Sequence, residues 1–245
     1  MCGFVGLYLN SNYNVEVRKL VSILNNMTNT LKHRGPDNKD IYINEKEKLA
    51  FGFRRLSIID LKSSANQPMI SKNKDWVIIF NGEIYNYKTL KDRLKIKKNY
   101  WRSNSDSEVA LECISQYGFY NAIKKLNGMF AIAAYCISKK TLWLARDRFG
   151  EKPLYYNYDR TYGFTFASEL RAFSYFPNFK KQICQNALTQ YLRYGYVPEP
   201  LSIFKKTYKL EPGYIIKFDK KNQVLKKGYW DSIKSFVNAK KNKFK

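Results

Sequence analysis

The second residue of the chain, Cys2, has the chemistry of a nucleophile that carries its own base. If Met1 is removed, the thiol and the α-amine belong to the same residue. The reference pKa of an α-amine is about 7.7–8.0, so near neutral pH part of it is unprotonated and can accept the thiol proton. This arrangement needs no histidine. The alternative interpretation is that Cys2 is a small buried residue that begins a strand.

Three further sites could hold and activate a substrate for such a nucleophile. Arg55 follows a predicted strand, where its guanidinium could hold a carboxylate through two parallel hydrogen bonds. Asn81 and Gly82 offer a side-chain amide and a backbone N–H, and this pair suits a tetrahedral oxyanion. Asp106 begins a predicted helix and could face an ammonium group.

Each of these sites also has a purely structural explanation. Arg55 could form a surface ion pair, Asn81-Gly82 could be a hairpin turn, and Asp106 could cap its helix. Taken together, they fit one substrate, a free amino acid with a carboxylate, an ammonium and a side-chain amide.

Apolar periodicity predicts the elements that must position these residues. The predicted helices are 16–32, 87–94, 106–117, 119–126 and 186–194, and the third is capped by Ser105 or Asp106. The predicted strands are 3–10, 49–53, 76–80, 129–137, 141–146, 163–167 and 213–218. A turn at Asn81-Gly82-Glu83 is expected directly after the strand that ends at residue 80. The strand over 129–137 is apolar on both faces, which indicates two packed sheets with helices outside them, a layered α+β architecture.

A shift in composition near residue 177 divides the chain. We expect a domain over 2–176 and a connector over 177–232, which includes a rigid extended linker at 197–200. The basic tail, 233–245, has little to bury and is predicted to be disordered.

The composition excludes several classes of protein. No run of about 18 apolar residues exists for a transmembrane helix, and the N-terminus lacks the features of a signal peptide. The four cysteines are widely spread and His33 is the only histidine. This argues against zinc, excludes a metal site built on two or more histidines, and indicates a reducing compartment. We therefore expect a cytoplasmic protein with no metal and no membrane partner.

The formal net charge of +24 could indicate a nucleic-acid partner. Lysine greatly outnumbers arginine, and the excess is spread along the chain and is heaviest beyond residue 205. Phosphate-reading domains more often concentrate arginine and aromatic residues on one element. We interpret most of the charge as a solvated surface rich in lysine and asparagine, with no specific nucleic-acid site.

Six stretches, in order, resemble one family over residues 2–176. They are Cys2-Gly3, Arg34-Gly35-Pro36-Asp37, Arg55-Leu56-Ser57-Ile58, Asn81-Gly82-Glu83-Ile84-Tyr85-Asn86, Ser105-Asp106-Ser107-Glu108 and Arg146-Asp147-Arg148-Phe149-Gly150-Glu151-Lys152-Pro153-Leu154-Tyr155-Tyr156. The family is the glutaminase half, a class II glutamine amidotransferase domain of N-terminal-nucleophile type, of glutamine-hydrolysing asparagine synthetases. Two of the motifs favour this branch over the glucosamine-6-phosphate synthase and phosphoribosyl amidotransferase branches.

The resemblance implies a four-layer αββα sandwich, here with a short C-terminal extension. It implies that Cys2 attacks the side-chain amide of L-glutamine and that a Cys2 thioester leads to glutamate and ammonia. Asn81 and Gly82 would form the oxyanion hole. The remaining glutamine-binding residues it implies are Arg55 for the α-carboxylate, main-chain groups of Leu56, Ser57, Ile58 and Ile59, and Glu83 with Asp106. His33 has no role in this scheme.

The resemblance also has a limit. The synthetases continue into a domain with a Ser-Gly-Gly-x-Asp-Ser loop that binds ATP, whereas this chain contains no Gly-Gly pair. Residues 186–231 resemble the approach to that domain. We therefore expect a truncated gene product, an expression fragment or one half of a split enzyme, with no cofactor of its own.

The resemblance thus leaves partners and alternatives open. ATP and Mg²⁺ are implied only for the missing synthetase domain, which could be a separate subunit, and a homodimer stays open. One alternative is a related amidotransferase that amidates another carboxylate, such as a sugar acid. The other is a catalytically idle module that uses its basic tail on nucleic acid or an acidic partner.

Overall fold

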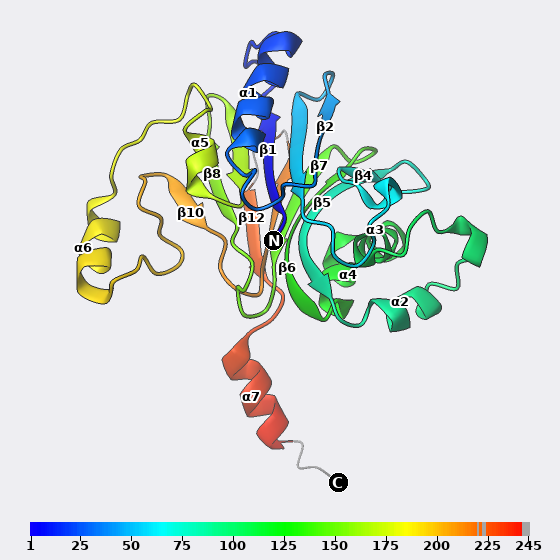
Figure 1. Ribbon diagram of the computed structural model, residues 1–245. Coiled ribbons are helices and arrows are strands. Elements are labelled where there is room, and N and C mark those ends of the chain that lie inside the picture. Colours follow the sequence, from blue (N-terminus) through cyan, green and yellow to red (C-terminus); the bar gives the residue numbers. More distant parts are fainter. Residues whose placement is uncertain (220, 222–223, 242–245) are drawn as a thin grey trace.

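Two antiparallel sheets form the centre of the computed structural model, which describes residues 1–219, 221 and 224–241 (Figure 1). Sheet A has the strand order β10 (Thr207–Lys209), β8 (Tyr155–Asp159), β9 (Gly163–Ala167), β1 (Gly3–Leu9), β3 (Leu49–Arg55), β2 (Asn38–Asn44). Sheet B has the order β12 (Val224–Gly228), β11 (Tyr214–Asp219), β7 (Thr141–Arg146), β6 (Gly128–Cys136), β5 (Trp76–Ile84), β4 (Met69–Ile70).

Helices cover the outer face of each sheet. On sheet A lie α1 (Val17–Asn29) and α5 (Leu170–Phe173), and on sheet B lies α3 (Asp106–Tyr117), with α2 (Tyr87–Arg93) and α4 (Phe119–Lys125) beside it. Short 3₁₀ turns occur at η1 (Ser63–Ala65) and η2 (Lys98–Tyr100). In Figure 1, α6 (Gln185–Tyr194) and α7 (Ser232–Lys241) project away from the sheets.

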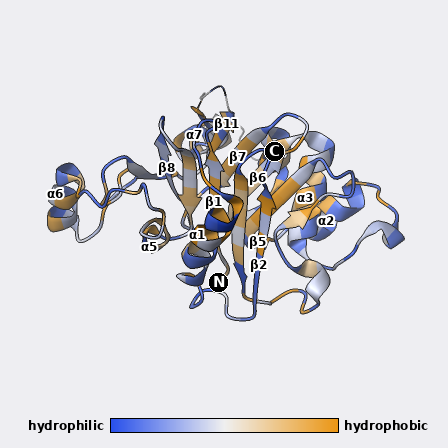
Figure 2. Ribbon diagram, turned by 90° about the horizontal axis from the view of Figure 1, so that it is seen from above, coloured by the Kyte–Doolittle hydropathy of each residue, from blue (hydrophilic) through white to orange (hydrophobic). Residues whose placement is uncertain are grey.

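Apolar side chains fill the space between the sheets and between each sheet and its helices. The layer between the sheets is rich in aromatic residues, among them Phe4, Phe51, Phe164, Phe166 and Phe218, all almost completely buried. Figure 2 shows the hydrophobic strands enclosed by amphipathic helices. The predicted four-layer αββα sandwich is confirmed.

Strand β1 places the start of the chain between the two sheets. Phe4 and Tyr8 belong to the layer between the sheets, whereas Val5 and Leu7 belong to the layer under α1. Side chains alternate between the faces of a strand, so residue 2 shares the inner face. Cys2 does pack against the inner layer.

Helix α3 has the predicted bounds because a capping residue marks its start and a glycine marks its end. The Ser105 side chain accepts a hydrogen bond from the Ser107 N–H, and the N-cap is therefore Ser105 and not Asp106. Gly118, with φ 74°, ends the helix. Asp106 is thus placed in the first turn, where a carboxylate is favoured by the helix dipole.

The predicted turn at Asn81-Gly82-Glu83 is wrong. Strand β5 continues to Ile84, and β6 pairs with it throughout, opposing Asn81 with Ala131. Asn-Gly is a strong hairpin signal, but tertiary pairing overrides it here. A glycine is required because a Cβ at residue 82 would lie 2.2 Å from the backbone oxygen of Met129.

Several strands leave little trace in the sequence. Strand β2 lies at the edge of sheet A with its residues half-buried, β12 lies at the edge of sheet B, and β10 has three residues. Edge strands need no regular apolar alternation, so the period-two signal is weak. Strand β8 contains the buried polar Asn157, which donates to the Lys206 oxygen at 2.9 Å.

Residues 177–232, the predicted connector, contribute β10 to sheet A and β11 and β12 to sheet B. Glu199 also forms an ion pair with Arg146 of β7, with 3.1 Å between Oε1 and Nη1. The division at residue 176 stays a prediction, but both sheets take strands from both of its sides.

The expected disordered tail is helical over 233–241, in α7, and residues 242–245 lie outside the described residues. Its apolar residues Ile233, Phe236 and Val237 have helical spacing, a signal that the basic composition obscured. All three side chains are exposed.

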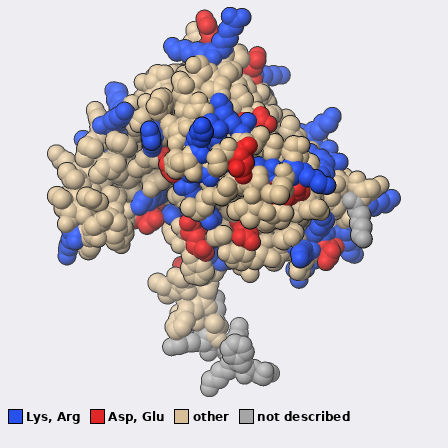
Figure 3. All heavy atoms as spheres, viewed as in Figure 1, with Lys and Arg blue, Asp and Glu red and all other residues tan. Residues whose placement is uncertain are grey.

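The surface charge is dispersed. Figure 3 shows lysine and arginine side chains spread over one face with aspartate and glutamate among them. Across the described part of the chain, none of the helices has the length and apolar character needed to cross a membrane.

The position of β1 can be tested at Gly6. A Cβ there would lie 2.0 Å from the tip of the buried Phe166 ring. We expect Gly6→Ala to lower the free energy of unfolding by about 1–3 kcal/mol through overpacking. The matched control is Gly228→Ala, whose nearest neighbour is a Tyr214 ring atom at 3.6 Å. Chemical denaturation showing equal losses for the two variants would contradict this packing of β1.

Candidate active site

A cavity of about 120 Å³ lies where β1 and β5 meet the start of α3. Its walls include every predicted site residue except Ser57, namely Cys2, Arg55, Leu56, Ile58, Ile59, Asn81, Gly82, Glu83 and Asp106. The Ser57 N–H instead donates to Asp37 Oδ2 at 2.7 Å. The size of the cavity limits its occupant to a small molecule, and the fold brings together residues from four separate stretches of sequence.

Both the backbone and the side chain of Cys2 are held by hydrogen bonds. Its carbonyl oxygen accepts from Arg34 Nε at 3.0 Å, and its Sγ lies 3.4 Å from the Leu56 nitrogen, whose N–H it accepts. Burial raises the pKa of the thiol, and the Leu56 N–H and the positive charges of the chain terminus and Arg55 offset this in part. A thiol with a raised pKa is protonated at neutral pH, so it needs a base before it can attack.

Asn81 presents an unused donor to the cavity. Its side chain is 1% exposed, and in the described part of the chain its Nδ2 has no hydrogen-bond partner. An unpaired buried amide costs about 1–3 kcal/mol, and this donor is therefore available to a ligand in the cavity. Asn81 has the same strand parity as Val77 and Ile79, which face the layer between the sheets, as Cys2 does. The Cys2 thiol and the Asn81 amide thus belong to the same cavity but come from opposite sheets.

The Arg55 side chain lines the cavity and also forms hydrogen bonds with the loop that follows it. Nη1 donates to the Lys62 oxygen at 2.9 Å and to Asn66 Oδ1 at 2.7 Å, and Nη2 donates to the Asp60 oxygen. These contacts use three of the five guanidinium hydrogens. Among the contacts of the described residues, none uses Nε or the second Nη2 hydrogen.

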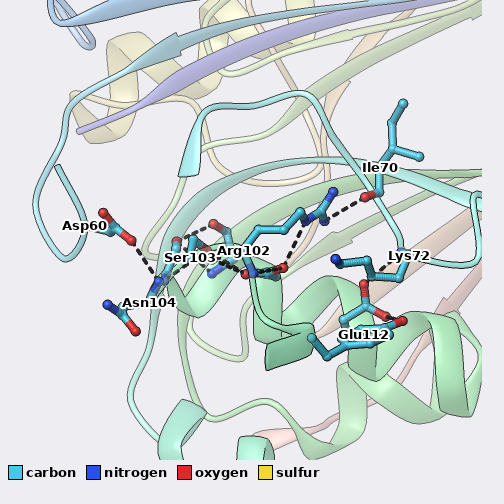
Figure 4. Close-up of polar contacts among 11 residues, drawn as sticks. Asp60, Ile70, Lys72, Arg102, Ser103, Asn104 and Glu112 are labelled. Carbon is cyan, nitrogen blue, oxygen red and sulfur yellow. Dashed lines mark hydrogen bonds and ion pairs between the residues drawn. The ribbon is translucent and has the colours of Figure 1, made fainter. Parts of the chain in front are cut away.

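The Asp60 side chain joins the loop after Arg55 to the loop before α3. Its Oδ1 accepts from the Lys62 N–H and its Oδ2 from the Asn104 N–H, both at 2.8 Å, and these bonds hold the pKa of the carboxyl below its usual value. Figure 4 shows Asp60 reaching toward Asn104. Arg55 directly precedes the first of these loops and Asp106 directly follows the second, so this bridge restricts the relative placement of the two charges.

Buried Glu108 organises the approach to α3. Its Oε1 accepts from the Arg102 N–H and Nε, both at 3.1 Å, and its Oε2 accepts from the Ser103 N–H and hydroxyl, both at 2.8 Å. Nearby, Glu112 accepts from the Lys72 N–H at 3.1 Å (Figure 4). These carboxylates support the helix and do not line the cavity.

Asp106 faces the cavity with its carboxyl partly satisfied. Its Oδ2 accepts from the Ile84 N–H at 2.8 Å. Burial raises the pKa of Asp106 to about 6, with Glu83 adding to the rise, and the N–H groups of Ile84 and Ser107 oppose it. The carboxylate is therefore costly to keep charged in an empty site, and a bound ammonium would favour its ionised form.

Lys152 and Met1 also line the cavity, and the sequence analysis does not assign them to it. Lys152 belongs to the motif that begins at Arg146, so the sequence marks the residue but does not indicate what its side chain does. The loop of that motif is wound around buried Asp147, whose carboxylate accepts four N–H groups, from Phe130, Phe149, Glu151 and Lys152. His33 does not line this cavity, and its Nε2 lies 3.1 Å from Glu169 Oε1.

This architecture is also found in solved structures of other proteins. The solved structure of glutamine phosphoribosylpyrophosphate amidotransferase from Bacillus subtilis, with bound ADP and GMP, superposes with a TM-score of 0.67 at 18% identity, over 94% of this chain and 49% of that one. This similarity concerns the fold. The shared features are two packed antiparallel sheets, and in this chain Cys2 packs against the layer between them.

The family follows from the sequence comparisons. The glutamine amidotransferase domain family matches residues 1–230, and this chain belongs to that family. It is 35% identical over 250 residues to a Methanocaldococcus jannaschii protein named as a glutamine-hydrolysing asparagine synthetase 2 and 40% identical over 215 residues to asparagine synthetase 1 of Bacillus subtilis. The matches cover 94% and 87% of this chain but only 47% and 33% of those proteins. The chain thus spans half or less of their length.

The raised pKa of Asp106 predicts a pH-dependent affinity for an amino-acid substrate. Below about pH 6 the carboxyl takes up a proton and loses the charge that would hold an ammonium. We expect the KM for L-glutamine to rise as the pH falls from 7 to 5, and Asp106→Asn to raise KM throughout and remove the dependence. A flat KM across this range in the unaltered protein would show that Asp106 does not hold the ammonium.

Arg55→Lys tests the guanidinium. We expect the KM for glutamine to rise well beyond tenfold, because an ammonium cannot reproduce a two-point contact and loss of one charge-assisted hydrogen bond costs about 1.5–3 kcal/mol. Arg54→Lys is the control, since Arg54 Nη2 donates to Asn29 Oδ1 on α1, away from the cavity. If steady-state kinetics show that both variants keep the original KM, a residue other than Arg55 binds the substrate carboxylate.

Proposed function

We propose that this chain hydrolyses L-glutamine to L-glutamate and ammonia through a thioester at Cys2. The observation that carries the proposal is the buried Asn81 Nδ2, which has no partner among the described residues and belongs to the same cavity as the Cys2 thiol. An amide donor beside a nucleophile suits the oxyanion of acyl transfer. Membership of the glutamine amidotransferase family supports glutamine as the acyl donor.

The proposed reaction begins with removal of Met1, which frees the Cys2 amine. The amine accepts the thiol proton, and the sulfur attacks the side-chain carbonyl of glutamine. The oxyanion is held by Asn81 Nδ2 and the Gly82 N–H. When the tetrahedral species collapses, the C–N bond breaks and the amine returns its proton to the departing ammonia. Water then attacks the thioester, again with the amine as base, and releases glutamate.

The ends of glutamine are held by opposite charges. The α-carboxylate meets Arg55 and main-chain groups of residues 56–59, and the ammonium meets Asp106, with Glu83 beside it. The Asp60 carboxylate joins the segment after Arg55 to the segment before Asp106, which supports a fixed placement of the two opposite charges. Leu56 binds the Cys2 sulfur directly, so the same loop positions nucleophile and substrate.

The fate of the ammonia rests on the relatives. Several are named asparagine synthetases, and each extends well beyond the region matched here. We propose that ammonia from this domain serves a carboxylate acceptor, aspartate or a related acid such as a sugar acid, activated by ATP and Mg²⁺ in a synthetase domain outside this chain.

Glutaminase assay of three variants tests the proposal. We expect Cys2→Ala to abolish glutamate release, because no other thiol lies in the cavity, and His33→Gln to keep most of it. The matched cysteine control is Cys184→Ala, at the start of α6. Intact mass should show that Met1 is absent from active protein. Equal losses in the Cys2 and His33 variants, or full activity with Met1 retained, would refute the mechanism.

A further inference from the structure

The Lys152 ammonium is a buried charge in the cavity that the proposed reaction leaves without a role. The side chain is 7% exposed. Within the described residues its Nζ donates to one group, the thioether sulfur of Met1, at 3.3 Å. A thioether is a weak acceptor, and no carboxylate of the described chain lies within ion-pair distance of this Nζ. A lysine in such surroundings is costly unless its charge is used.

The backbone of Lys152 is fixed on both sides, so the placement of the ammonium is built into the fold. Its N–H donates to Asp147 Oδ2 at 3.0 Å, and its carbonyl oxygen accepts from Arg146 Nε at 2.8 Å. Asp147 and Arg146 are themselves almost completely buried. The loop therefore aims the side chain at the N-terminus of the chain.

The contact with Met1 places the ammonium beside the start of the chain. The covalent path from this sulfur to the nitrogen of Cys2 runs through Met1 Cγ, Cβ, Cα and the carbonyl carbon. Once Met1 is removed, Lys152 loses its sulfur partner, and the nitrogen of Cys2 becomes a free amine in the same cavity. A positive charge near an amine disfavours the protonated amine and lowers its pKa.

The other charged groups near this point, apart from Glu83, have hydrogen-bond or ion-pair partners of their own. Arg34 also approaches Met1, with 3.9 Å between Nη2 and the sulfur, but it is paired with Glu169 at 2.8 Å. Arg55 is bound to its loop. The acidic groups that line the cavity are Asp60, Glu83 and Asp106. Asp60 and Asp106 are engaged by backbone N–H groups.

We propose that Lys152 is a positioning residue whose ammonium keeps the Cys2 α-amine unprotonated and so sets the lower pH limit of turnover. This inference rests on the proposed function. A base must be unprotonated at the working pH, and an α-amine with its ordinary pKa is mostly protonated at pH 7. Lys152 moves the amine toward the free form without itself touching the substrate.

The test compares the pH dependence of kcat for the full chain and for Lys152→Met, Lys152→Arg and a surface control, Lys139→Met. Lys139 is exposed on the turn between β6 and β7. We expect the acidic limb of kcat to move up by about one pH unit in Lys152→Met, because the amine regains its ordinary pKa. Activity at pH 6 should then fall about tenfold, with the plateau at high pH kept. Lys152→Arg and Lys139→Met should retain the original limb.

The kcat profile separates this effect from that of Asp106, whose protonation acts on KM. An unmoved limb in Lys152→Met would overturn the proposal. So would a rise in KM for glutamine at all pH values without a shift of the limb, because Lys152 would then contact the substrate.

A second measurement needs no turnover. The rate at which iodoacetamide alkylates Cys2, followed by mass spectrometry across pH, should show the same upward shift in Lys152→Met, and Lys152→Gln serves if the methionine variant does not fold. If the unaltered protein hydrolyses no glutamine, the proposed function fails, whereas the alkylation profiles still decide whether Lys152 governs the N-terminus. Identical profiles in all variants would refute the inference.

Discussion

Strand β1 is hydrogen-bonded to β9 on one side and β3 on the other, and this pairing fixes the place of residue 2. With Phe4 buried between the sheets, strand alternation leaves Cys2 no choice of face. Cys2, the proposed nucleophile, therefore needs no flexible loop to reach the cavity. A reacting group held by a sheet is placed more accurately than one on a loop. Met1 also lines the cavity, so the proposed reaction, which uses the Cys2 amine, requires that Met1 be removed.

The loops around the cavity depend on buried carboxylates that accept backbone N–H groups. Asp147 orders the loop that carries Lys152, Glu108 orders the segment before α3, and Asp60 ties that segment to the loop after Arg55. A buried carboxylate is unfavourable unless its oxygens are satisfied, and a satisfied one gives strong charge-assisted bonds. Each loop thus has one conformation in which its acid is paired. This accounts for a site with accurate geometry built from irregular backbone.

The sequence predicts the layers and most of the residues that line the cavity, because both depend on local patterns. Helix α3 has its capping serine and its terminal glycine within a few residues, and Cys2, Arg55, Asn81 and Asp106 stand next to recognisable elements. What the sequence hides is non-local. Asn81-Gly82 has the composition of a turn, and only the backbone of Met129 on the neighbouring strand explains the glycine.

The same limit applies to residues whose role is support. The acid of Asp147 and the amine of Lys152 are five residues apart, yet their effects depend on contacts with β6 and with the N-terminus. The net charge of +24 is no guide either. Glutamine is a zwitterion, so a site for it must present separated positive and negative groups and not an excess of one sign. Burial removes most groups from solvent screening, and a single unpaired ammonium there has more influence on a neighbouring amine than many exposed lysines. The chemistry of this cavity is therefore decided by which of its few charges lack a partner.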